Sequence, residues 1–158
     1  MTNDVQFDHW YTLALRYLQR RHRSEKEITD YLIKKKAPEK TIISIIGKLR
    51  PQNFVNDSEF AKWWIEQRTR FKPKGRYYIE QELQQKGIAK EVIASVYTDN
   101  APIIIPDKQK AIDLLERKKG KYENLSRHER YQKLGSFLAR RGFDYETIKQ
   151  SIDEVFGK

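Results

Sequence analysis

One helix-stop pattern recurs along the chain and constrains the fold more than any other feature. Between Lys72 and Ile93, the pair Lys86-Gly87 separates two short amphipathic segments. Glycine adopts a left-handed backbone without penalty, and a preceding lysine suits the negative end of a helix dipole, so a helix should end there. Arg141-Gly142-Phe143 repeats the pattern about fifty-five residues downstream, and Lys36-Ala37-Pro38 holds the matching place about fifty residues upstream. This period predicts tandem repeats.

The first unit is predicted to hold three helices. Apolar residues three and four apart indicate one buried face per helix. We expect the first helix to begin at Phe7 or Asp8, a capping box of Ser24 and Glu27 to start the second, and Pro38 to open the third. The predicted inward residues are Trp10, Leu13, Ala14, Tyr17, Leu18, Ile28, Tyr31, Leu32, Ile42, Ile43, Ile46 and Leu49, with Ile33 as a further candidate.

The second and third units repeat this arrangement. Asn56 or Asp57 should cap a helix that ends near Arg70, while Ser126 and Asp144 should cap the last two helices of the chain. A helix from Asp107 to about Lys119 precedes them. The predicted inward residues are Phe60, Ala61, Trp64, Ile65, Ile79, Leu83, Val92, Ile93, Val96, Tyr97, Ala111, Ile112, Leu115, Tyr131, Leu134, Phe137, Leu138, Ile148, Ile152, Val155 and Phe156.

The sequence thus predicts an all-α fold of three tandem three-helix repeats. A triplet of about fifty residues buries its own apolar faces poorly, so neighbours should stack into an elongated, curved array. Ile103, Ile104 and Ile105 are expected to dock on a neighbouring unit. The predicted organisation is a loose leader over residues 1–7, repeats over 8–51 and 52–98, a linker over 99–106, and a repeat over 107–158.

Composition indicates a soluble protein with an acidic partner. The net charge is +10 and the apolar fraction is 38%, and the pI is about 9.7 with a mean hydropathy of −0.87. Such a balance favours nucleic acid, an acidic protein surface or anionic lipid. There is no cysteine for a disulfide or thiolate site, no apolar run long enough to span a bilayer, and no signal-peptide layout. We expect a cytoplasmic protein without a membrane partner.

The sequence shows no pattern typical of an active site. His9, His22 and His128 have no spacing that suits a metal site or a catalytic dyad. The acidic residues are interpreted as helix caps or as partners of lysine and arginine, and Glu82 is predicted to be exposed and paired with Lys86. There is no phosphate-binding glycine loop. We therefore expect no catalysis, no cofactor and no metal.

Basic clusters recur at the turn between the first and second helices of each unit. They are either solvated faces that keep the chain soluble or parts of one binding surface, and their equivalent positions favour a surface. Tyr77 or Tyr78 could stack on a base or pack on a helix, and Trp63 could be an exposed anchor. The predicted binding residues are Arg20, Arg21, Arg23, Arg68, Arg70, Lys72, Lys74, Arg76, Lys118, Lys119, Arg127 and Arg130.

Four short motifs follow one another along the chain. They are Arg23-Ser24-Glu25-Lys26-Glu27-Ile28, Asn56-Asp57-Ser58-Glu59-Phe60-Ala61, Glu82-Leu83-Gln84-Gln85-Lys86-Gly87-Ile88 and Arg140-Arg141-Gly142-Phe143-Asp144-Tyr145. In this order they resemble the motifs of the RecX regulatory proteins of bacteria, and the resemblance covers nearly the whole chain. The chain departs from the pattern at Asn56, at Ile28 and at Ala37-Pro38. The last departure predicts that the first repeat lacks the left-handed helix end of the other two.

The resemblance implies a regulatory protein in homologous recombination, DNA repair and the SOS response. It implies a monomer that binds a RecA-type recombinase–DNA filament and inhibits its ATP hydrolysis, growth and strand exchange, with single-stranded DNA as a further contact. A DNA-binding protein that acts without a recombinase is the alternative, and its affinity should fall steeply with salt. A helical adaptor for an acidic protein, with its affinity in an apolar groove, is a third hypothesis.

Overall fold

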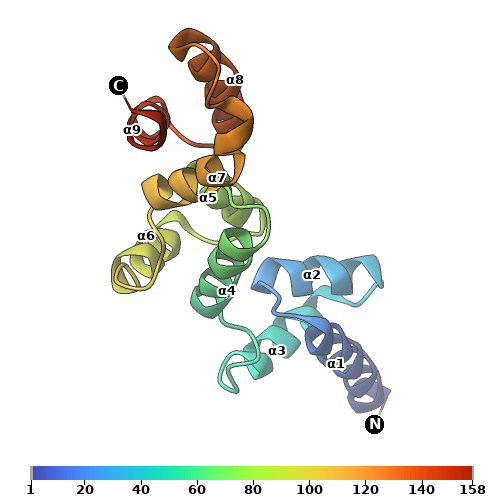
Figure 1. Ribbon diagram of the computed structural model, residues 1–158. Coiled ribbons are helices and arrows are strands. Elements are labelled where there is room, and N and C mark those ends of the chain that lie inside the picture. Colours follow the sequence, from blue (N-terminus) through green and yellow to red (C-terminus); the bar gives the residue numbers. More distant parts are fainter. Residues whose placement is uncertain (1, 158) are drawn as a thin grey trace. The chain divides into compact units, whose positions relative to one another are not determined.

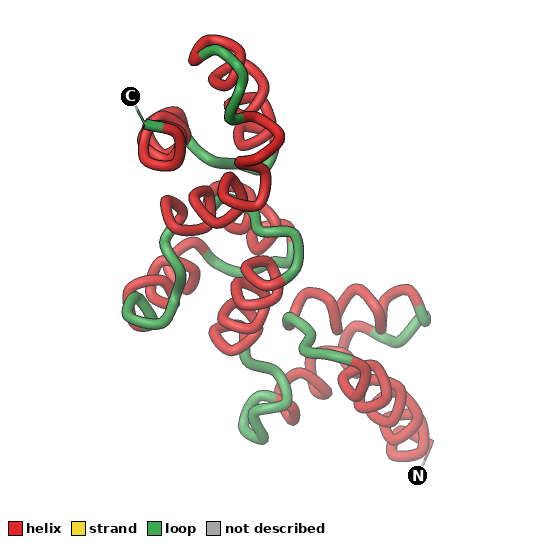
Figure 2. Tube along the Cα trace, viewed as in Figure 1, coloured by secondary structure: helices red, strands yellow, loops and turns green. Residues whose placement is uncertain are grey.

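The computed structural model of the chain describes residues 2–157, and all regular structure in that range is α-helical (Figures 1 and 2). The helices are α1 (Thr2–Arg20), α2 (Glu25–Lys34), α3 (Glu39–Leu49), α4 (Asp57–Arg70), α5 (Arg76–Gln85), α6 (Lys90–Asp99), α7 (Asp107–Tyr122), α8 (Arg127–Arg140) and α9 (Tyr145–Phe156). No strand occurs within residues 2–157, so the predicted all-α class is confirmed. The predicted elongation and curvature of the array stay a prediction.

The chain folds into two compact units, each with its own apolar core. One unit holds residues 1–63 and 83–96, and the other holds 64–82 and 97–158. In the first, α1, α2 and α3 pack against one another; in the second, α7, α8 and α9 do so. The first core consists of Ala14, Ile28, Leu32, Ile42, Ile45, Ile46, Leu49 and Val55. The second consists of Ala111, Leu114, Leu115, Leu134, Leu138, Phe143, Ile148, Ile152 and Val155.

Helix α1 begins earlier than the sequence predicts. It starts at Thr2, so residues 2–7 are helical and the prediction of a loose leader is wrong for them, while Met1 lies outside the described residues. The rings of Phe7 and Tyr11 stack with centroids 5.7 Å apart. The Lys48 ammonium lies 5.5 Å from the first centroid and 4.3 Å from the second. These contacts hold the first turns against α3, which periodicity in residues 1–7 alone does not reveal.

The buried stripe of α3 differs from the prediction by one position. Ile45 is fully buried, whereas Ile43 is 65% exposed. Positions 42, 45, 46 and 49 fall on one face at three- and four-residue spacing, and Ile43 lies about 100° around the helix from Ile42. The prediction that Ile43 faces inward is therefore wrong. On α2, Ile33 is likewise exposed, at 57%.

The segment between α6 and α7 contains the three consecutive isoleucines that were predicted to dock. Ile103 is 66% exposed and Ile105 is 42% exposed, while Ile104 is half-buried. The prediction of docking is wrong for Ile103 and Ile105. The amides of Ile103 and Ile104 both donate to the carbonyl of Asn100, so a local turn fixes the segment instead of packing on a neighbour.

The second helix of every repeat ends in the same left-handed turn. Gly87 has a φ of 83° and Gly142 a φ of 90°, as predicted, and Lys36 has a φ of 69°. After each of them the next amide donates to a carbonyl five residues back, from Ala37 to Leu32 in the first repeat and likewise in the others. The prediction that the first repeat lacks this turn is wrong. Lysine adopts the conformation there, although a side chain makes it costly.

Replacing Lys36 with glycine should therefore raise the free energy of unfolding by about 0.5–1 kcal/mol. The left-handed turn is retained, the side chain is exposed, and glycine removes the conflict between Cβ and the carbonyl. Urea unfolding followed by circular dichroism measures the change.

The matched control is Lys34→Gly in the last turn of α2. This variant also removes an exposed lysine side chain, but from a right-handed helical position, where glycine lowers the free energy of unfolding by about 1 kcal/mol. A Lys36→Gly protein destabilised to the same degree would show that residue 36 does not hold a left-handed backbone.

Candidate partner-binding surface

The second helices of the three repeats start at matched positions, and these starts organise the basic clusters around them. Ser24, Gly75 and Ser126 precede α2, α5 and α8, and each is separated from the next by 51 residues. Ser24 and Ser126 each form a complete capping box with the glutamate three residues later. Gly75 accepts the amide of Ile79 through its carbonyl and occupies the same place at the start of α5.

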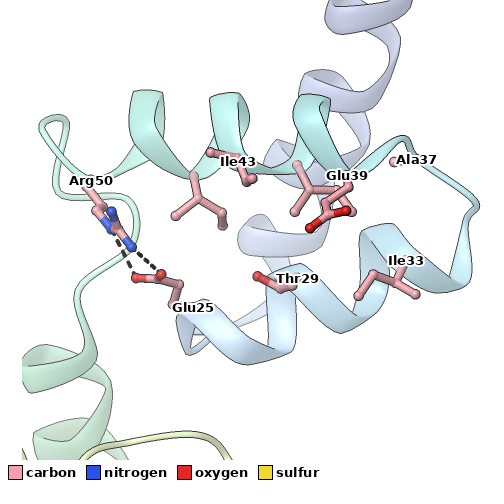
Figure 3. A pocket seen from close by; sticks show the side chains of 9 residues that line it. Glu25, Thr29, Ile33, Ala37, Glu39, Ile43 and Arg50 are labelled. Atoms are coloured by element: carbon pink, nitrogen blue, oxygen red, sulfur yellow. Dashed lines mark hydrogen bonds and ion pairs between the residues drawn. The ribbon is translucent and has the colours of Figure 1, made fainter.

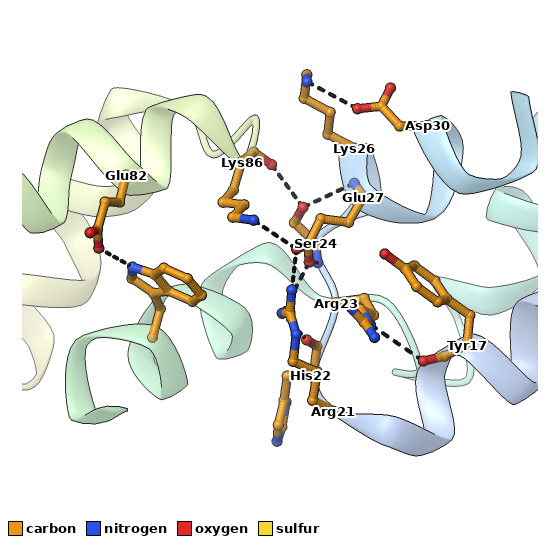
Figure 4. A network of polar contacts seen from close by, with 11 residues as sticks. Tyr17, Arg21, His22, Arg23, Ser24, Lys26, Glu27, Asp30, Glu82 and Lys86 are labelled. Carbon is orange, nitrogen blue, oxygen red and sulfur yellow. Dashed lines mark hydrogen bonds and ion pairs between the residues drawn. The ribbon is translucent and has the colours of Figure 1, made fainter. Parts of the chain in front are cut away.

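At the start of α2, two groups from the second repeat satisfy polar atoms of the first, and Figure 4 shows one of them, the carbonyl of Lys86 beside Ser24. The fully buried Ser24 donates its hydroxyl hydrogen to the carbonyl of Lys86 at 2.7 Å. The amide of Glu25 donates to the carboxylate of Asp57 at 3.0 Å. The residue before the left-handed glycine and the first residue of α4 thus meet one helix N-terminus. Burial, the largest influence, raises the pKa of Asp57, although the Glu25 amide opposes it.

Glu27 links the same helix start to two cations. Its carboxylate lies 2.6 Å from an Arg21 nitrogen and 3.2 Å from the Lys86 ammonium, and it accepts the Ser24 amide at 3.0 Å. Burial would raise the pKa of Glu27, but the hydrogen bonds from Arg21 and Ser24 outweigh burial and lower it. Figure 4 shows this carboxylate between the arginine and the lysine. The network fixes Arg21, one of the predicted binding cations.

The start of α5 makes two corresponding contacts with the third repeat, and here the Gly75 amide donates in place of the Ser24 hydroxyl. The Gly75 amide donates to the carbonyl of Arg141 at 2.7 Å, and the Arg76 amide donates to Asp107 at 2.9 Å. A Cβ on Gly75 would lie 2.1 Å from the carbonyl oxygen of Gly142. Glycine is therefore required where the other repeats use serine. Sequence reasoning treated Asp57 and Asp107 only as helix starts, and the 50 residues that separate them are the signal that relates them.

Two further cations hold the segment before α5 in place. The ammonium of Lys110, which is buried, donates to the carbonyl of Lys74 at 3.1 Å. Burial lowers the pKa of Lys110, although nearby Asp107 opposes this effect. A guanidinium nitrogen of Arg141 lies 3.4 Å from the carbonyl of Pro73. Neither cation was predicted to act here, and both serve the fold.

Two predicted cations of the second repeat, Arg68 and Lys74, contact Glu82. Its carboxylate accepts from Arg68 at 2.9 Å, from Lys74 at 2.7 Å and from the Trp64 indole at 2.8 Å. The Glu82 side chain is only 19% exposed, so the prediction that it is exposed is wrong. Arg76 pairs with Glu80 at 2.7 Å and also lies over the Tyr97 ring.

Cations of the other clusters are also engaged by the fold. Arg23 lies 3.8 Å from the centroid of the Tyr17 ring and donates to the carbonyl of Tyr17. Arg130 donates to the carbonyl of Leu125 at 3.1 Å. The remaining contacts are Lys118 over the Phe137 ring at 4.7 Å, Arg127 beside Asp153 at 3.7 Å, and Arg127 over the Tyr131 ring at 5.5 Å.

Four of the predicted binding residues are exposed and take part in none of the contacts described above. Arg20 lies at the end of α1, Arg70 at the end of α4, Lys72 in the turn before α5, and Lys119 in the last turns of α7. Lys72 has a φ of 53°, which tilts this turn away from a helical path. Each predicted corner thus contains exposed cations next to cations that already contact carboxylates, carbonyls or aromatic rings of the protein. That the three corners form one surface stays a prediction.

The aromatic side chains that were predicted to contact a partner also differ in exposure. Trp63 is half-buried and stacks on His22 with centroids 5.3 Å apart, so the prediction of an exposed anchor is wrong. Tyr78 lies half-buried beside Gly142, and Tyr77 is exposed. Of these two tyrosines, Tyr77 is therefore the exposed one.

Two further features, a metal site and a membrane-spanning helix, were sought among the described residues. Within residues 2–157, no three histidine, aspartate or glutamate side chains gather where they could hold a metal ion. None of the helices in this range combines the length and apolar character that crossing a membrane requires.

Profiles of the first, second and third three-helix domains of RecX match residues 11–49, 56–96 and 107–152. The chain belongs to the RecX family. Regulatory protein RecX of Bacillus pumilus is 34% identical over 146 residues, which cover 90% of this chain and 54% of that protein. Its counterpart in Chlorobium phaeobacteroides is 32% identical over 148 residues, which cover 92% and 93%. The chain therefore spans about half of the first RecX protein and nearly all of the second.

Solved RecX structures share the fold. The crystal structure of RecX from Lactobacillus salivarius superimposes with a TM-score of 0.82 at 26% identity and covers 96% of this chain and 97% of that one. A second structure, titled as regulatory protein RecX, gives a TM-score of 0.79 at 27% identity over 96% and 75%. The three-helix repeats predicted from the 50-residue period are thus confirmed as RecX domains. The relatives are named as regulatory proteins rather than enzymes.

Proposed function

We propose that this protein binds a RecA-type recombinase–DNA filament and restrains its ATP hydrolysis, growth and strand exchange. Membership of a family of regulatory proteins supports a regulatory role. The net charge of +10 suits a partner built around a polyanion. We further propose that the protein acts in the cytoplasm as a monomer and regulates DNA repair and recombination through this contact.

The observation that carries the proposal is that the basic cluster of the second repeat, residues 68–76, contains both cations held by the fold and exposed cations. Arg68 and Lys74 are held by Glu82, so their positions are fixed by the fold. Arg70 and Lys72 lie between them in the chain and are exposed. Exposed cations on a fixed turn can contact phosphate or carboxylate groups with little further loss of conformational entropy in the turn. This favours specific docking over non-specific electrostatic attraction.

Direct contact with single-stranded DNA is the second candidate contribution. Tyr77 is exposed directly after Arg76, whose guanidinium is already held by Glu80. An exposed tyrosine beside a basic turn can stack on an unpaired base. We propose this contact as an addition to filament binding. The alternative is a protein that binds bare DNA and does not need the recombinase.

The test is ATP hydrolysis by recombinase polymerised on single-stranded DNA. The wild-type protein should lower the rate in a saturable manner. The double variant Arg70→Glu/Lys72→Glu should need about tenfold more protein for the same inhibition, because attraction becomes repulsion at two exposed positions.

The control is Lys90→Glu/Lys149→Glu, which reverses two exposed lysines on α6 and α9 and should inhibit like wild type. Circular dichroism checks that both variants remain helical. If wild type leaves hydrolysis unchanged at saturation, the proposed function is wrong; if both variants inhibit equally, the assigned site is wrong.

A further inference from the structure

The first repeat contains an open groove between α2 and α3 (Figure 3). The groove has a volume of about 490 Å³. Ile42 and Ile46, each 5% exposed, belong to the core beneath it. Ile33 from α2 and Ile43 from α3 also line it, and both were considered as inward-facing residues but are exposed. The groove is therefore apolar at its base and along both walls.

An isoleucine at the exposed position 43 is a property of this repeat and is not required by the fold. The seventh residue after the left-handed turn is Ile43 in the first repeat, Ala94 in the second and Lys149 in the third, and all three are exposed. The fold accepts a small or a charged side chain at this place. An isoleucine here leaves apolar surface in water, which stabilises a complex if a partner covers it.

Charged side chains at the two ends of the groove restrict what can cover it. At one end, Arg50 and Glu25 form an ion pair through both carboxylate oxygens. At the other end, Glu39 lies exposed at the first position of α3, as Figure 3 shows. The lining charges therefore leave an excess of one carboxylate. This acidic end differs from the basic corners and favours a cationic group next to the apolar contact.

We propose that the isoleucine groove, defined by Ile33, Ile42, Ile43 and Ile46, binds a helical segment of the recombinase. The segment presents adjacent aliphatic side chains to the groove and a lysine or arginine to Glu39. Two helices form the walls, and an amphipathic helix laid between them buries its apolar side chains at three- and four-residue spacing. The inference rests on the proposed function and adds an apolar contact to the charged one.

The two contacts differ in their response to salt, which makes them separable. Salt screens exposed charges, so the effect of reversing Arg70 and Lys72 should shrink as salt rises. Ile43→Glu should lower the affinity for recombinase-coated single-stranded DNA about tenfold at low and high salt alike, because it removes apolar burial. Ile43→Leu should bind nearly like wild type.

The matched control is Ile103→Glu, which changes an isoleucine of equal exposure outside the groove and should bind like wild type. Fluorescence anisotropy of labelled filaments measures each affinity, and circular dichroism checks the fold. If Ile43→Glu binds like wild type, the groove proposal is overturned while the proposed function stands. If wild type does not bind filaments, both are overturned.

Sedimentation of the protein alone tests a different occupant. We expect wild type and Ile43→Glu to sediment as monomers. A wild-type dimer that Ile43→Glu dissociates would show that a second copy covers the groove, and the recombinase would then not be its occupant.

Discussion

Replacing Gly75 with alanine should lower the free energy of unfolding by about 2 kcal/mol or more. The added Cβ would lie 2.1 Å from the carbonyl oxygen of Gly142 and 2.4 Å from its carbonyl carbon. Both are backbone atoms, and the Gly75 amide is bonded to the adjacent carbonyl of Arg141 at 2.7 Å. Relief requires separating the start of α5 from the turn before α9. Urea unfolding measures the loss.

Gly75→Ser sharpens this experiment because serine is a better helix N-cap than glycine. By capping preference alone it should stabilise α5, but the same close contact should make it destabilising. Gly120→Ala is the control, since a Cβ there meets nothing within 4 Å and α7 should gain up to about 1 kcal/mol. A stabilised Gly75→Ser protein would show that the two backbones do not meet at this place.

Replacing Glu82 with glutamine should cost about 1–3 kcal/mol at neutral pH. The carboxylate accepts from Trp64, Arg68 and Lys74, and a neutral amide cannot satisfy two partly buried cations equally well. Glu66→Gln on the exposed face of α4 is the control and should change stability by no more than about 0.5 kcal/mol.

The loss at Glu82 should also depend on pH in a defined direction. Burial would raise the pKa of Glu82, but hydrogen bonds from Lys74, Trp64 and Arg68 outweigh burial, and the pKa lies below the 4.5 of a free glutamate. A lowered pKa contributes stability that is complete above about pH 4.5 and is lost as the pH falls through the folded-state value. Wild type and Glu82→Gln should thus converge in stability in acid. A constant difference down to pH 2 would contradict the ion-pair account.

Local sequence rules predicted the helices and most of their ends. Ser24 with Glu27, Ser126 and Asp144 satisfy helix amides that no earlier residue can reach, so their positions follow from the chain alone. Gly87 ends α5 for an equally local reason. These are short-range effects, and the structure confirms them.

Sequence reasoning failed where tertiary contacts outweigh local preference. Lys36 holds a left-handed backbone although its own propensity opposes it, and in this turn the Ala37 amide donates to the Leu32 carbonyl. Ile43 and Ile45 are equally apolar, and which of them is buried depends on the rotation of α3 against α1 and α2. The sequence did not single out Gly75, because the role of this residue depends on a carbonyl 67 positions later.

The sequence positions of the basic clusters could be predicted, but the contacts of their individual cations could not. Basic residues at the turns between first and second helices are visible in the sequence. Which of them are available depends on carboxylates and rings that come from other segments, as Glu82 does for Arg68 and Lys74. The predicted set of twelve cations therefore mixes residues that stabilise the fold with exposed residues such as Arg70 and Lys72.

The affinity of the wild-type protein for recombinase-coated single-stranded DNA, compared with its affinities for bare DNA and for free recombinase, tests the proposed function most directly. Anisotropy at two salt concentrations provides all three values. Filament regulation predicts tighter binding to the coated strand than to either component, with part of that affinity retained at high salt. Equal affinity for bare and coated DNA, falling steeply with salt in both cases, would instead identify a DNA-binding protein that needs no recombinase.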